Sequence, residues 1–337
     1  MTAQKQPTHD IVVIAASSGG LEALSALTAA LPADLGATVF VVMHLQPGFD
    51  SRLPELLNRN SPLKSTFALH GETITPGRIY IAPADNHLQL RDGYVQVVRG
   101  PKENGHRPAA DALFRTASTA YGPRVIGVVL TGYRDCGTAG LLSIKARGGI
   151  AVVQSPETAT VPEMPRSAIA HVAVDHVVPL SEIPDLIVRL VQEPAIPMQR
   201  PVPQLAVIEG EQPGAPVEIP CPLCQGHMTA AKVGDFSYFR CHVGHAFSLG
   251  SMAAEQAEEL ERALWAAVRA LQESASMAKR LGGAAPASLR ERLAEKAQAQ
   301  NQQAETIREM LLGQTRLFKS DADVVTGAGA ETAAENH

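Results

Sequence analysis

Short apolar runs rich in β-branched residues alternate with segments of helical periodicity from residue 8 to about residue 193. Strands that alternate with helices form mainly parallel sheets, which helices cover on both faces. The sequence therefore predicts a doubly wound, Rossmann-like α/β domain, with an antiparallel edge where Pro-Gly and Asp-Gly turns separate short strands in residues 66–98. The predicted strands are 11–16, 38–43, 78–82, 94–98, 124–130, 150–154 and 172–178, and the predicted helices are 20–30, 51–59, 109–120, 137–147 and 182–192.

The composition changes several times after residue 193, which predicts further domains. Residues 194–220 hold seven prolines and predict a semi-extended linker. A small cysteine- and histidine-containing module follows at 221–247, and two apolar heptad stripes predict an antiparallel helical hairpin at 248–313. The hairpin is a candidate surface for a homodimer. The polar tail at 314–337 is expected to be disordered.

Charge and cysteine distribution limit the partners and the compartment. The net charge is -5, and no long run of lysine and arginine is present, so nucleic acid is not expected as a partner. No apolar stretch reaches the length of a membrane span, and the first ten residues do not resemble a signal peptide. Three of the four cysteines are clustered, which indicates metal binding rather than disulfides. A cytoplasmic protein is therefore expected.

The turn Ser17-Ser18-Gly19-Gly20 joins the first predicted strand to the first predicted helix. Open α/β sheets place their ligand sites at this edge, and a helix amino terminus supplies free backbone N–H groups for an anion or a developing oxyanion. The turn thus indicates a serine nucleophile. The alternatives are an N-cap followed by glycines for a tight turn, or a phosphate-binding loop. The turn matches neither common nucleotide-binding glycine motif, which disfavours the latter.

A serine needs a base to be nucleophilic at neutral pH. His44 follows the second predicted strand and Asp135 follows the strand at 124–130, so parallel pairing would bring both to the edge that carries Ser17. In a serine triad the carboxylate holds the imidazole in the correct tautomer and stabilises the imidazolium. The alternatives are structural: a hydrogen-bonded histidine at a strand end, and an aspartate that caps a helix.

These segments, in order, resemble the catalytic domain of the CheB family of chemotaxis receptor methylesterases over about residues 8–193. The turn at 15–20 resembles the family's G-A-S-T-G-G turn, and residues 42–49 resemble its V-Q-H-M-P-P-G-F segment. Further collinear matches are Ile81-Ala82-Pro83 with His87, His106-Arg107-Pro108 with Asp111 and Phe114, and Glu163-Met164-Pro165-Arg166.

The resemblance implies an enzyme that hydrolyses glutamyl γ-methyl esters on chemoreceptors and deamidates some receptor glutamines. Ser17 would be the nucleophile and His44 the base, and no cofactor is implied for catalysis. Backbone N–H groups near Gly19 or Gly20 would hold the oxyanion. The implied partners are the cytoplasmic helices of methylated receptors and other chemosensory signalling proteins. The residues expected to contact substrate are Ser18, Gly19, Gly20 and Tyr133.

The sequence departs from the family at two points. The family's L-T-G-M-G-x-D-G loop aligns with residues 130–137, and its triad aspartate then falls on Cys136, one residue after Asp135. Either Asp135 rotates into the role or the triad lacks its carboxylate, a loss on the order of 10⁴ in turnover for a serine triad. The chain also starts at the catalytic strand, so activation through an attached receiver domain is not expected.

The module at 221–247 has the spacing of a zinc site. Cys221 and Cys224 form a C-x₂-C pair, and Cys241 and His245 follow as C-x₃-H. Three thiolates and an imidazole make a closed tetrahedral site, so the zinc is expected to be structural. His242 and His227 compete as the fourth ligand. The alternatives are free cysteines in a small core, or a redox-active C-x-x-C pair.

Two further functions compete with a methylesterase that uses Ser17, His44 and Asp135. A CheB-like adaptor with an impaired triad would bind signalling partners through its C-terminal module, and the shift from Asp135 to Cys136 favours this reading. A general serine esterase is the other. The chain lacks the G-x-S-x-G elbow of α/β-hydrolases, which argues against that version of it.

Overall fold

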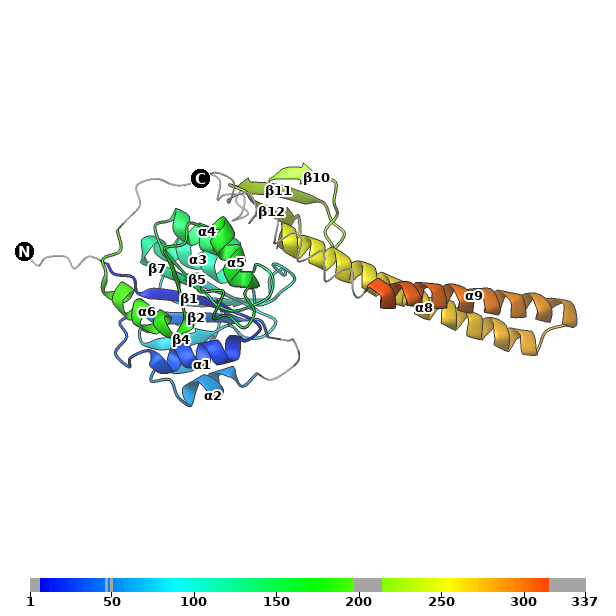
Figure 1. The fold of residues 1–337 in the computed structure, drawn as a ribbon, viewed down its shortest axis with the longest axis horizontal. Coiled ribbons are helices and arrows are strands. Elements are labelled where there is room, and N and C mark those ends of the chain that lie inside the picture. The colour runs from blue at the N-terminus through cyan, green and yellow to red at the C-terminus, as the bar shows by residue number, and fades with distance from the viewer. Residues whose placement is uncertain (1–6, 46–47, 49–50, 197–213, 315–337) are drawn as a thin grey trace, which may run out of the picture. The chain divides into compact units, whose positions relative to one another are not determined.

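The computed structural model describes residues 7–45, 48, 51–196 and 214–314, arranged in two compact units, Met1–Met252 and Ala253–His337 (Figure 1). The linker predicted at 194–220 and the tail predicted at 314–337 fall mostly outside the described residues. In the described part of the chain, no helix is both long enough and apolar enough to cross a membrane.

A seven-stranded parallel sheet forms the centre of the first unit, which confirms the predicted fold class. The strand order is β3-β4-β2-β1-β7-β8-β9, so β1 lies between β2 and β7. Residues of β1 are buried throughout, as expected for a strand covered on both faces. The strands are β1 (Ile11–Ala16), β2 (Thr38–Met43), β3 (Lys64–Phe67), β4 (Arg78–Ile81), β7 (Val125–Val129), β8 (Ile150–Gln154) and β9 (His176–Val178).

Helices cover both faces of this sheet, because alternate residues of each strand point to opposite sides. On one face Val12 and Ile14 pack with helices α1, α2 and α6, and on the other Val13 and Ala15 pack with α3, α4 and α5. The helices are α1 (Gly20–Ala30), α2 (Leu53–Asn58), α3 (Ala110–Tyr121), α4 (Thr138–Ala146), α5 (Glu163–His171) and α6 (Ile183–Gln192), with short 3₁₀ turns at Gly122–Arg124 and Leu180–Glu182.

Residues 66–98 are only partly antiparallel. Strands β5 (His87–Arg91) and β6 (Tyr94–Val98) form the expected hairpin as a separate two-stranded sheet. The antiparallel prediction is wrong for the strand predicted at 78–82, which forms β4 and pairs in parallel with β2. Strand β3, which the sequence does not predict, pairs in parallel with β4 and extends the main sheet. Burial explains the difference for β4, whose last three residues are fully buried against the sheet. Helix α5 is not predicted from the sequence, since it is nine residues long and has a proline in its first turn.

A four-stranded antiparallel sheet makes up most of residues 214–248, here called the Cys/His module. Its side chains Phe236, Tyr238 and Ala246 form a buried cluster with Ala139 of α4, so the module packs on the α/β domain. The strands, in sheet order, are β10 (Ala215–Val217), β11 (Met228–Val233), β12 (Phe236–Cys241) and β13 (Ala246–Ser248).

Helices α8 (Leu249–Gly283) and α9 (Ala287–Gln314) form the predicted antiparallel hairpin. Val268 packs with Ala304, and Ala278 packs with Ala297, which sets the two helices antiparallel. The apolar stripe proposed as a dimer surface is thus largely used between the two helices of the same hairpin.

A substitution at Gly140 tests how closely α3 packs on α4. A Cβ atom at this position would lie 2.5 Å from Cβ of Phe114 and 3.0 Å from Cα of Asp111. We expect Gly140→Ala to lower the free energy of unfolding by about 1–3 kcal/mol, because overpacking outweighs the better helix propensity of alanine. Urea denaturation followed by far-UV circular dichroism measures this change. The control is Gly36→Ala, where the nearest atom is 3.7 Å away; equal effects of the two substitutions would contradict the prediction.

Candidate active site and metal centre

Ser17 lies at the carboxyl end of β1, held by its own backbone. Its N–H donates to the carbonyl of Thr131 at 2.9 Å, and its carbonyl accepts from Gly20 N–H at 2.8 Å. Gly19 has φ +75, and a Cβ atom there would lie 2.6 Å from Cβ of Thr160. Only glycine therefore fits at this point of the turn, which fixes the serine in front of helix α1.

His44 lies beside Ser17 because β1 and β2 are paired in parallel register. Ala16 pairs with Met43, so the two residues that follow reach the same edge of the sheet. The Nδ1 atom of His44 is 3.0 Å from Oγ of Ser17, a hydrogen-bond distance. The structure thus brings together the serine and the histidine that the sequence singles out.

The surroundings of His44 disfavour its protonation. Its ring stacks on that of His106, with centroids 3.9 Å apart and an angle of 21° between the planes. Burial, followed by the charges of His106 and Arg134, lowers the pKa of His44 well below the ordinary histidine value. The imidazole is therefore neutral near pH 7, as a proton acceptor must be.

Asp135 does not take the place of a triad carboxylate in this structure. Its Oδ1 atom accepts a hydrogen bond from the Ser251 hydroxyl at 2.6 Å, and its Oδ2 atom accepts one from the Ser248 hydroxyl. Among the described residues, Asp135 makes no hydrogen bond or ion pair with His44. The expectation that Asp135 orients the imidazole is therefore corrected: its carboxylate faces the Cys/His module.

Cys136, which the resemblance aligns with the family's aspartate, is a neutral thiol. It is 1% exposed, and its sulfur accepts a hydrogen bond from Ala110 N–H at 3.3 Å. Burial, with the nearby Asp111 charge, raises the pKa of this thiol well above its usual value. No acidic side chain in the described part of the chain is hydrogen-bonded to His44.

Asp111 is a structural residue of this region to which the sequence pattern assigns no role. It is fully buried, and burial raises its pKa to about 6. Its carboxylate accepts hydrogen bonds from Gly140 N–H at 2.7 Å, Gly137 N–H at 3.1 Å and the Asn104 side chain at 2.8 Å. Asp111 therefore caps the start of α4 and holds the end of the loop that carries Asp135. The available signal was one acidic residue in the otherwise apolar start of α3.

The residues expected to contact substrate differ in whether their polar groups are available. The N–H of Gly20 already donates to Ser17, so it is not available for an oxyanion. The N–H groups of Ser18 and Gly19 donate no hydrogen bond to any described residue, and both precede the first turn of α1. Tyr133 is 56% exposed on the loop after β7.

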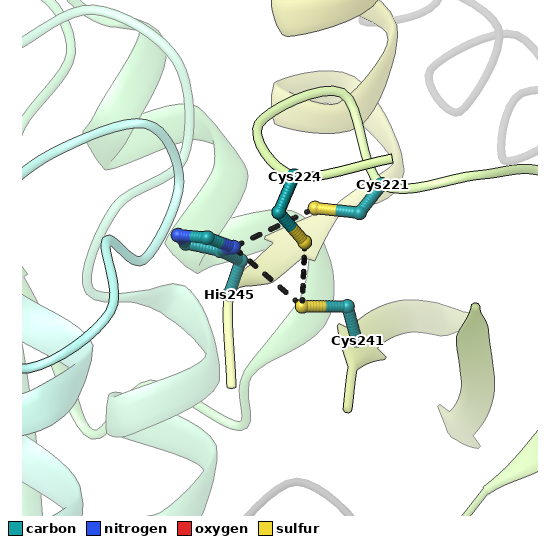
Figure 2. Close-up of side chains that lie close together, drawn as sticks. All are labelled: Cys221, Cys224, Cys241 and His245. Atoms are coloured by element: carbon teal, nitrogen blue, oxygen red, sulfur yellow. Dashed lines mark hydrogen bonds between the residues drawn. The ribbon is translucent and has the colours of Figure 1, made fainter. Parts of the chain in front are cut away.

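The four predicted metal ligands converge in the Cys/His module (Figure 2). The ligand atoms of Cys221, Cys224, Cys241 and His245 all lie within 4.8 Å of one another. The Sγ atoms of Cys224 and Cys241 are 3.7 Å apart, and Nδ1 of His245 is 3.5 Å from Sγ of Cys241 and 3.7 Å from Sγ of Cys221.

These distances match the edges of a tetrahedral metal site. With metal–sulfur bonds of about 2.3 Å and metal–nitrogen bonds of about 2.0–2.1 Å, the edges are about 3.8 Å between sulfurs and about 3.5 Å between sulfur and nitrogen. His242 and His227 are not members of the cluster. The ring of His242 instead lies against Gly226, where a Cβ atom would be 2.2 Å from Cε1 of that ring.

Comparison with known proteins agrees with this architecture. The family model described as CheB methylesterase matches residues 12–187. A putative protein-glutamate methylesterase/protein-glutamine glutaminase of Leptospira interrogans is 38% identical over 185 residues, which cover 55% of this chain and 96% of that relative. The catalytic domain of Thermotoga maritima CheB methylesterase, a crystal structure, has 36% sequence identity and a TM-score of 0.53 over 54% of this chain and 98% of that one.

A longer relative extends the comparison. The protein-glutamate methylesterase/protein-glutamine glutaminase of Pyrococcus abyssi is 38% identical over 190 residues, which cover 55% of this chain and 52% of that relative. The chain thus spans about half the length of this curated protein.

The lowered pKa of His44 sets the pH range in which Ser17 reacts. A pKa of His44 below the ordinary value of about 6.5 keeps the imidazole neutral at lower pH. The pH at which the reaction rate of Ser17 begins to fall is therefore lower too. We expect the rate of Ser17 labelling by a fluorophosphonate to stay flat from pH 8 to about pH 6.5 and to fall only at lower pH. In His106→Asn, which removes the neighbouring ring, the midpoint should move upward. A midpoint at or above 6.5 in the unchanged protein would contradict the prediction.

Proposed function

This chain belongs to the CheB methylesterase family, and from that premise we propose that it hydrolyses γ-methyl esters of glutamate side chains in proteins. The observation that carries the proposal is the 3.0 Å distance between Oγ of Ser17 and Nδ1 of His44 at the carboxyl edge of the sheet. The names of its relatives also support a glutaminase activity, which replaces methanol by ammonia as the leaving group.

Ser17 attacks the ester carbonyl while His44 takes the hydroxyl proton. The tetrahedral intermediate collapses, His44 returns the proton to the methoxide, and methanol leaves an acyl group on Ser17. Water then attacks this acyl group with His44 again as base, and His44 returns the proton to Oγ of Ser17 as the glutamate carboxyl is released. The N–H groups of Ser18 and Gly19 are the candidates for stabilising the oxyanion.

In this proposal Ser17 and His44 act as a catalytic pair, without the carboxylate of a triad. Because no described carboxylate is hydrogen-bonded to His44, the imidazolium that forms in the transition state is less stabilised, and loss of this partner in a serine triad costs on the order of 10⁴ in turnover. The stacked ring of His106 restrains the plane of His44 but supplies no negative charge. We therefore expect a slow enzyme compared with one that has a complete triad.

The substrates proposed for this activity are the cytoplasmic helices of methylated chemoreceptors, with chemosensory signalling proteins as further partners. These proposals rest on family membership, and a cytoplasmic location fits them. No described residue near Ser17 identifies a particular receptor.

A structural zinc ion is the proposed occupant of the Cys/His centre. Three thiolates and one imidazole at tetrahedral spacing fit zinc, and four protein ligands leave no open position for hydrolytic chemistry. When bound, the ion would keep the thiols deprotonated and staple a sheet too small to fold well by itself. Cys221, Cys224, Cys241 and His245 would hold it.

A non-catalytic adaptor is the second candidate function. The observations that favour it are the neutral thiol of Cys136 and the orientation of Asp135, whose carboxylate faces the Cys/His module. An adaptor would keep the receptor-binding surface of the family without turnover.

Methanol release from a methylated receptor cytoplasmic fragment separates the two functions. We expect release by the intact protein to fall at least about 10³-fold in Ser17→Ala and in His44→Gln, because each substitution removes a member of the reacting pair. Ser25→Ala, a serine of helix α1 remote from the turn, serves as the control and should retain full activity. No release from the intact protein, with a fragment that another methylesterase demethylates, would support the adaptor instead.

Metal analysis of the purified chain tests the zinc proposal. We expect about one zinc per chain, and a loss of most of it in Cys224→Ser, because a tetrahedral site with three remaining ligands binds the ion much more weakly. Cys136→Ser is the matched control, since its thiol lies outside the cluster, and should retain the metal. Equal zinc content in the three proteins would show that the ion does not bind at the Cys/His centre.

A further inference from the structure

Asp135 sits on the amino terminus of helix α8. Ser248 is the N-cap of this helix, since its Oγ accepts the Ser251 N–H at 3.0 Å. Both serine hydroxyls donate to the Asp135 carboxylate. A Cβ atom at Gly250 would lie 3.3 Å from Oδ2 of Asp135, so the carboxylate rests directly against the first turn of the helix. A negative charge is favoured at this end of the helix dipole.

A second set of hydrogen bonds joins strand β13 to the α/β domain. Asn104 N–H donates to the Ala246 carbonyl at 2.7 Å, and Ser248 N–H donates to Oδ1 of Asn104 at 2.9 Å. The same Asn104 side chain donates to Asp111, which holds the start of α4. Asn104 is 2% exposed, so these bonds are shielded from water.

Glu103 adds a buried ion pair to this contact. Its carboxylate accepts hydrogen bonds from the Arg115 guanidinium at 2.6 and 3.1 Å and from the Tyr238 hydroxyl of the Cys/His module at 3.5 Å. Buried polar and charged groups are costly to leave unpaired. The contact between the module and the α/β domain is thus a packed interface with specific polar partners.

The loop at 131–137 connects this interface to the nucleophile. At its first end, the Thr131 carbonyl accepts the Ser17 N–H at 2.9 Å, and the Thr131 hydroxyl donates to the Ser18 carbonyl at 2.8 Å. A Cβ atom at Gly132 would lie 2.8 Å from Cβ of Ser17, so loop and serine are in direct contact. At its other end, Asp135 is held by the two serines.

We propose that Ser248 and Ser251 clamp Asp135 and, through the loop at 131–137, hold Ser17 in place against His44. The Cys/His module is then a positioning part of the active site, and Asp135 is a positioning residue rather than the acid of a triad. The metal ligands Cys241 and His245 close the turn that leads into β13, where the Cys241 N–H donates to the His245 carbonyl at 2.9 Å. This inference rests on the proposed function, because it needs Ser17 as a nucleophile.

The competing role for Asp135 is to act on His44 directly. If Asp135 acts on His44 directly, Asp135→Asn lowers the rate of the Ser17 reaction severely, and substitution of the two serines leaves this rate unchanged. If the clamp acts, the aspartate and the serines work through the same contact. Substituting the aspartate or the serines then lowers the rate of the Ser17 reaction by the same factor, and substituting both lowers it no further.

The test measures how fast Ser17 reacts with a fluorophosphonate, and what fraction of molecules reacts, in the full-length chain. The proteins compared are the intact chain, Asp135→Asn, the double variant Ser248→Ala with Ser251→Ala, and the combination of all three substitutions. We expect each of the first two variants to react about 10- to 100-fold more slowly, since small displacements of reacting groups cost this much. The combined variant should be no slower than either.

Two readouts separate positioning from simple loss of folded protein. A destabilising substitution lowers the fraction of molecules that react, whereas a positioning substitution lowers the rate constant of molecules that all react. Ser248→Thr keeps both the hydroxyl and the helix cap, and should restore a rate within about twofold of the intact chain.

The clamp is overturned by any of four results. These are unchanged rates in the serine variant, a faster reaction in it, a lowered reacting fraction at an unchanged rate, or a loss near 10⁴-fold confined to Asp135→Asn, as a triad acid would give. Absence of Ser17-dependent labelling in the intact chain would overturn the proposed function and the clamp with it. Failure of the clamp alone leaves the intact chain reactive, so the two failures are distinguishable.

Discussion

The parallel pairing of β1 with β2 on one side and β7 on the other is the constraint on which the site depends. Ala16 lies opposite Met43, and Ala15 lies opposite Val129, so the chain leaves all three strands at one level of the sheet. Ser17, His44 and the loop after β7 follow from this register. A shift of any pair by one residue would turn the reacting side chains to opposite faces.

Two neighbouring residues of the loop after β7 have different surroundings. Cys136, which the resemblance aligns with the family's aspartate, is buried and neutral, and its sulfur accepts a hydrogen bond from the backbone of α3. The preceding Asp135 points the other way, to the helix amino terminus of α8. Burial, with the charges of His106 and Arg134, lowers the pKa of His44, so the imidazole is neutral and able to accept a proton, while the imidazolium that results is poorly stabilised.

The sequence predicts the site where the signal is local. Ser17 and His44 directly follow apolar strands, and their meeting needs only the usual parallel order of such strands. The four residues of the Cys/His cluster, which are the proposed zinc ligands, are predicted from their spacing within 25 residues. The partners of Asp135 could not be predicted, because Ser248 and Ser251 lie 113 and 116 residues away and carry no motif. Asp111 belongs to a segment that resembles the family, but its contacts with Asn104, Gly137 and Gly140 depend on the tertiary packing of α3 on α4 and carry no sequence signal.

The same distinction holds for the fold. Strands β1, β2 and β8 are found at the predicted residues, because most of their side chains are apolar and buried. Strand β3 is an edge strand with one large apolar residue, Phe67, and gives no such signal. Turn residues alone suggested antiparallel pairing for β4, and its burial beside β2 decided otherwise.

The covalent intermediate is the most direct test of the account. The intact protein would be mixed with a synthetic peptide that contains a glutamyl γ-methyl ester, quenched in acid and examined by peptide mass spectrometry. The account predicts an adduct on Ser17 with the mass of the peptide less methanol, formed by the intact chain and absent from Ser17→Ala. Methanol release that persists in Ser17→Ala, or an acyl group on another residue, would contradict it.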